Sequence, residues 1–309
     1  MPAAVYILGS INYDLMTQVD CLPDQGETRM GQGAHFSVGG KGTNQAATCG
    51  SLGVNTFLVG AVGNDFFGKQ ALSYLLIHGV DISKVNILND QTTGTAFILT
   101  CDGDNRIIVN SGANASISFR QVEEALKQAQ AGDLFVTQFE TPMNLLLPCL
   151  KLAKEKGMVT LVNPSPYKSF DAMTYPLIDY LVLNQLEAQA LCQGALDTLD
   201  DLGIFQEKAM ELGLNKLVLT LGSRGSFLIT KTEKIHEPAY SIQVVDSTGA
   251  GDAFLDGLAF ALTQNLSDQA SLTFANALGA LTCLSYGAGS IRYQADQVYN
   301  WMAKQAKLD

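Results

Sequence analysis

A glycine-rich segment near residue 250 combines an anion-binding backbone with a carboxylate. Residues Asp246–Phe254 read D-S-T-G-A-G-D-A-F and open a predicted helix over Ala250–Leu262. Glycine lets the N–H groups of a first helical turn approach an anion, and the helix dipole adds about half a positive charge there. Asp252 could cap this helix or accept a proton from a substrate hydroxyl. An anion cradle beside a base is what phosphoryl transfer to an alcohol needs, so we favour that interpretation over capping alone.

A second glycine-rich segment, Gly39–Ala46, reads G-G-K-G-T-N-Q-A. Its glycines carry no β-carbon, so the backbone can lie directly against a ligand. Lys41 and Asn44 add donors for hydroxyl or phosphate oxygen. We therefore predict a ligand-binding turn.

Further polar residues follow predicted strands. Asn12 and Asp14 come after the first strand, and Glu140 comes after a later one. Parallel strands end at a common edge, so these side chains are expected to meet. Asn184 and Glu187 have the N-x-x-E spacing of a helix capping box, which we weigh above a ligand-binding role at this point.

These residues must be positioned by alternating strands and helices. Short apolar runs predict strands at Val5–Ile11, Thr56–Ala61, Leu134–Gln138, Val159–Asn163, Tyr180–Asn184 and Lys216–Thr220, with a strand-like stretch at Ile242–Val245. Helical patterns lie at Gly42–Leu52, Phe66–His78, Ser118–Ala129, Met143–Lys156, Leu186–Cys192, Ile204–Leu212, Ala250–Leu262, Gln269–Leu284 and Ala295–Lys307. This order predicts an α/β sheet with helices on both faces.

Two stretches do not fit the alternation. Residues of about 14–37 and 93–110 contain short β-type segments such as Thr95–Leu99 and Arg106–Val109, joined by turn signals. We expect them to form one small sheet, which is either a lid over the carboxyl edge or a mere insertion. No linker or repeat divides the chain, so residues 1–309 are expected to be a single domain.

Composition excludes several classes of protein. With 47% hydrophobic and 16% charged residues among 309, the chain has enough apolar material for a globular core. Its net charge of −11 argues against binding nucleic acid or anionic lipid by bulk electrostatics. The six cysteines form no C-x-x-C pair, and no apolar run approaches the roughly 18 residues of a membrane span. We expect a cytoplasmic protein with no membrane partner.

The two glycine-rich segments resemble the two signatures of the PfkB family of carbohydrate kinases. The likeness extends along nearly the whole chain through Gly9–Asp14, Gly26–Thr28, Gly112–Ala115, Gln138–Pro142 and Thr220–Gly225. The resemblance implies a ribokinase-like three-layer α/β/α sandwich with a small β-sheet lid that often forms a dimer interface. It also implies transfer of the γ-phosphoryl group of ATP, with Mg²⁺, to the primary hydroxyl of a sugar.

The resemblance also implies roles for individual residues. Asp252 would be the catalytic base, beside an anion hole of Gly249, Ala250 and Gly251. The sugar would be bound by Asn12, Asp14, Gly40, Lys41, Asn44, Glu140 and Asp252. The nucleotide would contact Asn184, Thr220, Gly222, Ser223, Gly225, Gly251 and Asn276. Glu187 would act on Mg²⁺ through water, and an activating K⁺ would lie at Asp246, Thr248, Thr282, Ser285, Gly287 and Ser290.

Two departures from the family pattern bear on these roles. The loop over residues 285–290 is one residue shorter than usual and lacks a proline. Tyr13 stands where many members have a small or aliphatic residue, and strand alternation predicts that it turns away from Asn12 and Asp14. The leading acceptor is the 5-hydroxyl of D-ribose. The alternative acceptors are fructose, deoxyribose and a nucleoside. A sugar-binding regulator without catalysis is another alternative. A dinucleotide-dependent oxidoreductase is disfavoured because no G-x-G-x-x-G turn follows the first strand.

Overall fold

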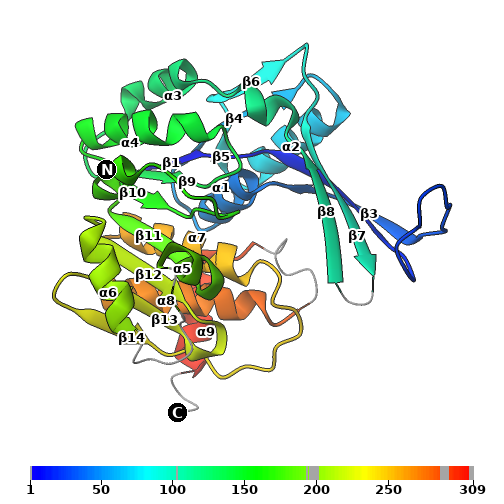
Figure 1. Cartoon of the computed structure of the whole chain (residues 1–309). Helices are drawn as coiled ribbons and strands as arrows, with labels where there is room; N and C mark the ends of the chain where they lie inside the picture. Colours follow the sequence, from blue (N-terminus) through cyan, green and yellow to red (C-terminus); the bar gives the residue numbers. More distant parts are fainter. Residues whose placement is uncertain (1, 102–103, 193, 195–201, 286–291, 306–309) are drawn as a thin grey trace.

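The computed structural model describes residues 2–101, 104–192, 194, 202–285 and 292–305, which form a large sheet between two layers of helices (Figure 1). The order across the large sheet is β14-β13-β12-β11-β10-β9-β1-β4-β5, and β6 pairs with β4. The strands are β1 (Val5–Leu8), β4 (Thr56–Gly63), β5 (Val80–Asp81), β6 (Val85–Leu88), β9 (Leu134–Thr137), β10 (Val159–Val162), β11 (Tyr180–Asn184), β12 (Lys216–Thr220), β13 (Ser226–Ile229) and β14 (Lys234–Glu237).

Most neighbouring strands of this sheet are parallel, and β12, β13 and β14 are joined antiparallel at one edge. Side chains alternate between the two faces, as in β1, where Tyr6 and Leu8 join one core and Val5 and Ile7 the other. Because both faces are covered, the central strands β1, β4, β9 and β10 are largely apolar, whereas the edge strand β14 is polar and partly exposed.

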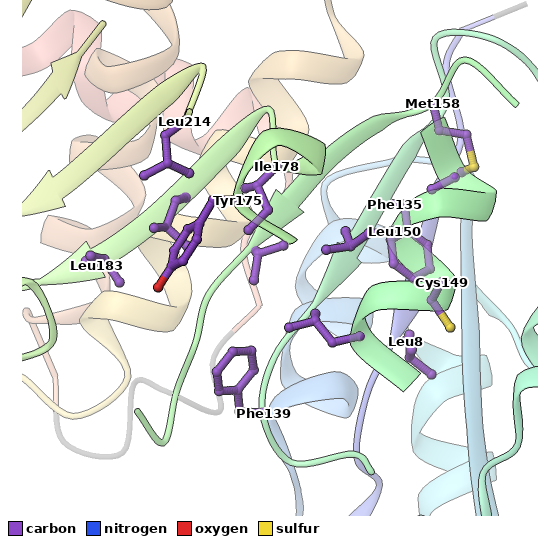
Figure 2. Close-up of a cluster of buried hydrophobic side chains, with 14 of the residues drawn as sticks. Leu8, Phe135, Phe139, Cys149, Leu150, Met158, Tyr175, Ile178, Leu183 and Leu214 are labelled. Atoms are coloured by element: carbon purple, nitrogen blue, oxygen red, sulfur yellow. The ribbon is translucent and has the colours of Figure 1, made fainter. Parts of the chain in front are cut away.

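The helices divide between the two cores. One core contains residues of α3 (Phe119–Ala125), α4 (Leu146–Glu155), α5 (Gln185–Cys192) and α6 (Leu202–Glu211). The other contains residues of α1 (Lys41–Ser51), α2 (Phe66–Ile77), α7 (Ala250–Thr263), α8 (Asp268–Thr282) and α9 (Ala295–Gln305). Figure 2 shows the first core, where Phe135 of β9 and Leu150 of α4 are both fully buried.

A separate four-stranded sheet projects from this body in Figure 1. Its order is β3-β2-β7-β8, formed by β2 (Asn12–Gln18), β3 (Gln32–Gly39), β7 (Gly94–Cys101) and β8 (Asp104–Asn110). Strand β2 continues from β1 after a short turn, so Asn12 and Asp14 lie where the two sheets meet. The small sheet was expected from the sequence, and its action as a lid stays a prediction.

The three-layer α/β/α arrangement is therefore as predicted, and the differences are local. The stretch Ile242–Val245 is not a strand, because the N–H of Val245 donates to the carbonyl oxygen of Cys283 (2.8 Å), after α8, instead of joining a ladder. The β13–β14 hairpin was not anticipated. The predicted helix Ser118–Ala129 is split into α3 and a short 3₁₀ turn. Within the described ranges, no helix is long and apolar enough to cross a membrane.

Candidate active site

The first turn of α7 carries the predicted base. Gly249 precedes the helix with φ of 80°, a left-handed conformation that glycine adopts without strain, and Asp252 lies in the first turn. The Nζ of Lys41 lies 3.3 Å from Oδ1 of Asp252, and both side chains are largely buried. Burial acts to lower the pKa of Lys41, but the carboxylates of Asp252 and Glu140 outweigh it, so the pKa is raised. The lysine is therefore a fixed positive charge beside Asp252.

Close backbone packing places Lys41 at this point. A β-carbon on Gly42 would lie 2.5 Å from the carbonyl carbon of Gly9, so α1 packs directly on the turn that follows β1. The backbone N–H of Lys41 donates to Oε2 of Glu140 (3.1 Å), which also accepts from the hydroxyl of Ser10 (2.5 Å). Glu140 thus joins the start of α1 to the carboxyl edge of the sheet.

The first strand of the small sheet brings Asn12 and Asp14 to the same region. Asn12 is 4% exposed, and its Oδ1 accepts from Nδ2 of Asn114 (2.8 Å). Nδ2 of Asn114 also donates to the carbonyl oxygen of Ile11, and Oδ1 of Asn114 accepts from the N–H of Ile11. Burial, followed by the charge of Glu140, raises the pKa of Asp14 from 3.8 to about 6. Ionised Asp14 is therefore disfavoured in the ligand-free site, and hydrogen-bond donors from a ligand would stabilise it.

One cavity of about 940 Å³ joins these parts. It is lined by Asp14 and Asn44 from the predicted sugar-binding set, by Gly249 and Asp252 at α7, and by one face of the small sheet. Lys41 and Glu140 are tied to this group by the bonds described above, and a positive φ of 87° at Gly40 turns the chain into α1. The structure thus brings the predicted base and sugar-binding residues together.

In the anion hole, the N–H of Ala250 donates to the carbonyl oxygen of Ser247 (3.2 Å). A β-carbon on Gly251 would meet nothing within 4 Å, so the backbone there is open to a ligand. Gly251 therefore fits the predicted anion hole better than Ala250 does.

The predicted nucleotide residues lie along the neighbouring part of the carboxyl edge. Asn184 ends β11 directly opposite Thr220 at the end of β12. Beyond β12, a 3₁₀ turn over Gly222–Arg224 carries Ser223 and ends at Gly225, where a β-carbon would lie 2.1 Å from the carbonyl oxygen of Glu237. These residues surround a turn at the edge of the sheet, outside the lining of the cavity described above.

Several residues of this group also have structural partners. Asn184 and Glu187 exchange hydrogen bonds of 3.0 and 2.9 Å between backbone and side chain, so the capping box is real. The amide of Asn276 donates to the carbonyl oxygens of Glu237 (3.0 Å) and Pro238 (3.1 Å), joining α8 to the end of β14.

The predicted metal ligands are only partly described. Asp246 Oδ1 accepts from the N–H of Thr248 (2.9 Å), and the hydroxyl of Thr282 donates to the carbonyl oxygen of Leu278 (3.0 Å). Ser285 is partly buried after α8, whereas Gly287 and Ser290 lie outside the described residues. Among the described residues, no group of three or more His, Cys, Asp or Glu side chains could hold a metal ion. The family resemblance would have Glu187 act on Mg²⁺ through water, which is compatible with an ion that keeps several waters and binds substrate phosphates.

Tyr13 turns away from the cavity, as strand alternation predicts. Its ring stacks on Phe67 of α2, with centroids 4.6 Å apart. It therefore forms part of the packing between the small sheet and α2.

Three polar residues near the site carried no role in the sequence analysis. Asn114 holds Asn12, Asp256 lies one turn beyond Asp252, and Arg292 contacts Asn44. Asn114 lay within a recognised motif, Gly112–Ala115, and that was the signal that could have identified it.

Comparisons with known proteins agree with this architecture and site. The sequence matches the pfkB family of carbohydrate kinases over residues 3–294. It is 34% identical to the ribokinase of Lactococcus lactis over 285 residues, covering 92% of each chain, and 27% identical to a deoxyribokinase of Salmonella typhi over 301 residues, covering 97% and 98%. A solved ribokinase of Arabidopsis thaliana, complexed with ribose and ATP, has a TM-score of 0.90 at 29% identity, with 98% of this chain and 99% of that chain covered.

The fold and the site define a sugar phosphotransferase of the ribokinase-like type. The chain belongs to the pfkB family of carbohydrate kinases.

Proposed function

We propose that this kinase transfers the γ-phosphoryl group of ATP to the 5-hydroxyl of D-ribose, with Asp252 as the general base. The observation that carries the proposal is the position of Asp252, at the start of α7 and 3.3 Å from Lys41, in the cavity that Asp14 also lines. The similarity to ribokinases over nine-tenths of the chain supports ribose as the acceptor.

In this proposal Asp14 and Asn12 hold the sugar at one end of the cavity, and Asp252 removes the proton of the primary hydroxyl at the other. A carboxylate accepts two hydroxyl protons at once, which suits Asp14 to a pair of sugar hydroxyls. These donors would also replace the water that Asp14 has lost by burial. The sugar is thus oriented with one hydroxyl at the base.

The backbone at Gly249 and Gly251 would stabilise charge on the transferring group, because first-turn N–H groups have no partner within the helix. Lys41 would add a positive charge on the sugar side. The nucleotide would lie along Asn184, Thr220, Gly222, Ser223, Gly225 and Asn276. Mg²⁺, held through water by Glu187, would neutralise phosphate charge when bound.

Replacing Asp252 by Asn tests the mechanism. The amide keeps the size of the side chain but cannot accept the proton, so kcat should fall about 10²- to 10⁴-fold while KM for ribose stays within a few-fold. Arg120→Met, an exposed change on α3, is the matched control and should leave kcat unchanged. An Asp252→Asn enzyme as active as the parent would refute the assignment of the base.

A sugar panel tests the substrate. ATP turnover should be measured with D-ribose, 2-deoxy-D-ribose, D-fructose and a nucleoside, and kcat/KM is expected to be highest for ribose. The similarity to a deoxyribokinase makes deoxyribose the second candidate. A preference for any other acceptor would overturn the assignment of ribose, and the absence of turnover with every sugar would favour a regulator without catalysis.

We further propose that the small sheet closes over the sugar and forms a homodimer interface. Met16, Ile98 and Ile107 line the cavity from one face of the sheet. On the opposite face, β-sheet register aligns Phe36, Leu15, Phe97 and Ile108 in one apolar row across all four strands. Phe36 and Ile108 are 60% and 67% exposed, and such rows are usually covered by a partner.

The remaining parts of the proposal are activation by K⁺ and a cytoplasmic location. Asp246, Thr248, Thr282 and Ser285 are the members of the proposed K⁺ site that lie within the described residues. Equal activity in K⁺ and in a bulky organic cation would refute the proposed K⁺ site. The cytoplasm supplies ATP, and scattered cysteines without C-x-x-C spacing fit a reducing compartment.

A further inference from the structure

A cluster of polar residues extends the cavity beyond the proposed sugar site. Asn44 and Thr48 of α1, Asp256 of α7 and Arg292 ahead of α9 all line the cavity that contains Asp252. The family resemblance makes Asn44 a sugar ligand, and the proposed reaction leaves the other three residues without a function.

Asp256 is an unusual residue for the interior of a helix that packs on both α1 and α8. It is 2% exposed, and among the described residues nothing donates a hydrogen bond to its Oδ1. Burial raises its pKa well above the usual range, and the charge of Asp252 acts in the same direction. A hydrogen bond from Thr48 and the positive charges of Arg292 and Lys41 oppose this shift. Ionising a carboxyl buried in this way is costly, so the interior favours the neutral form of Asp256.

Arg292 connects this acid to the sugar site. Its Nη2 donates to Oδ1 of Asn44 over 3.2 Å, although the two residues are 248 positions apart in the sequence. A guanidinium group has donors and no acceptor, so it can bind only the oxygen of the carboxamide. The reversed orientation would place the NH₂ group of Asn44 against another donor. Arg292 therefore selects one of the two orientations of Asn44 and leaves Nδ2 as the atom available to a ligand.

We propose that Arg292 is a positioning residue for the sugar, which orients Asn44 so that Nδ2 donates to a sugar oxygen. The inference rests on the proposed function, because it takes Asn44 as a sugar ligand. In this proposal Asp14 accepts hydrogen bonds from sugar hydroxyls, whereas Asn44 donates a hydrogen bond to a sugar hydroxyl. Because a hydroxyl group both donates and accepts, neighbouring hydroxyls of an intact diol can satisfy the two residues together.

The test is a double-mutant cycle on Asn44 and Arg292, read by steady-state kinetics. Arg292→Met should raise KM for ribose about tenfold, with KM for ATP and kcat within twofold of the parent. In an Asn44→Ala background, Arg292→Met should not raise KM for ribose further, because Arg292 acts on the sugar only through Asn44. Arg292→Lys keeps a donor and should restore most of the affinity, and Arg120→Met on the surface should change nothing.

Loss of folding is separated from loss of positioning by a second variant. Asp256→Asn keeps Arg292 and its hydrogen bond to Asn44, so KM for ribose should stay within twofold of the parent. Tm is measured on every variant, and Arg292→Met should show the raised KM at a temperature well below its Tm. An unchanged KM in Arg292→Met, independent effects of the Asn44 and Arg292 changes, or an Asp256→Asn variant with KM raised as much as in Arg292→Met would each overturn the inference.

Measurements on the parent enzyme distinguish a failure of this inference from a failure of the proposed function. If it prefers another sugar, the assignment of ribose fails, and the same cycle is run with the preferred sugar. If it phosphorylates no sugar, ribose affinity is measured by calorimetry on the same variants, with the same expected ratios. Binding unaffected by Arg292→Met would then refute the inference.

Discussion

Replacing Asp14 by Asn should stabilise the protein while destroying its affinity for sugar. Burial and the nearby charge of Glu140 raise the pKa of Asp14 from 3.8 to about 6, so ionised Asp14 is disfavoured in the folded protein. A rise of about two pKa units corresponds to about 3 kcal/mol at neutral pH. An uncharged amide of the same shape avoids this cost.

The magnitude can be expressed as a melting temperature. At roughly 2.1 cal/mol/K per residue, the entropy of unfolding of 309 residues is about 0.65 kcal/mol/K, so the gain at pH 7.5 is about 3–5 °C. The sign follows from linkage. Because the folded pKa lies above the unfolded one, the favourable contribution of Asp14 is complete below pH 3.8 and is lost as pH rises through about 6. The advantage of Asp14→Asn should therefore fall to about half at pH 5.

The assay is differential scanning calorimetry of the sugar-free protein at pH 7.5 and pH 5, with ribose kinetics on the same samples. We expect kcat/KM for ribose to fall at least about 100-fold in Asp14→Asn, since charge-assisted hydrogen bonds are lost. For the parent, kcat/KM should decrease as pH falls below about 6, when Asp14 becomes protonated. Asp20→Asn is the control, because the pKa of exposed Asp20 is lowered by hydrogen bonds from Cys21 and Arg29, so its removal should not raise Tm. A lower Tm in Asp14→Asn at pH 7.5 would refute the reasoning.

Three further predictions concern packing, assembly and magnesium. Gly42→Ala should lower the free energy of unfolding by about 1–3 kcal/mol in a denaturation assay, because the new β-carbon would lie 2.5 Å from the backbone of Gly9. Gly203→Ala is the control: nothing lies within 4 Å of a β-carbon there, so this change should be neutral or stabilising in the same assay. Ile108→Asp should convert the proposed dimer to a monomer in light scattering, and a parent that is itself monomeric would contradict the interface. Glu187→Gln should raise the Mg²⁺ concentration for half-maximal activity several-fold while leaving KM for ribose unchanged, and EDTA should abolish turnover of the parent.

Much of the architecture could be predicted because local pattern and burial agree. Apolar runs at Tyr180–Asn184 and Lys216–Thr220 form strands with the predicted bounds, since a strand covered on both faces must be apolar throughout. The stretch Ile242–Val245 has the same composition without the strand. A strand needs a neighbouring ladder, and its backbone bonds to the end of α8 instead.

The candidate site was predictable where a residue type already implies its chemistry. Glycines beside Lys41 and before Asp252 indicate anion and hydroxyl binding, because close backbone approach depends on the missing β-carbon. Asn114 and Arg292 were not predictable in this way, since each acts only by contacting a residue about 100 or more positions away.

By itself, the sequence determined most of the order of strands and helices and the two glycine-rich segments that we propose bind sugar and phosphate, and its net charge of −11 argued against nucleic acid as a partner. Only the tertiary structure decided which of these groups share one cavity, how burial and the charge of Glu140 raise the pKa of Asp14, and which atom of the Asn44 carboxamide Arg292 engages. The reason is that backbone pattern is encoded within a few residues, whereas burial and charge depend on distances through space between segments that the chain keeps far apart.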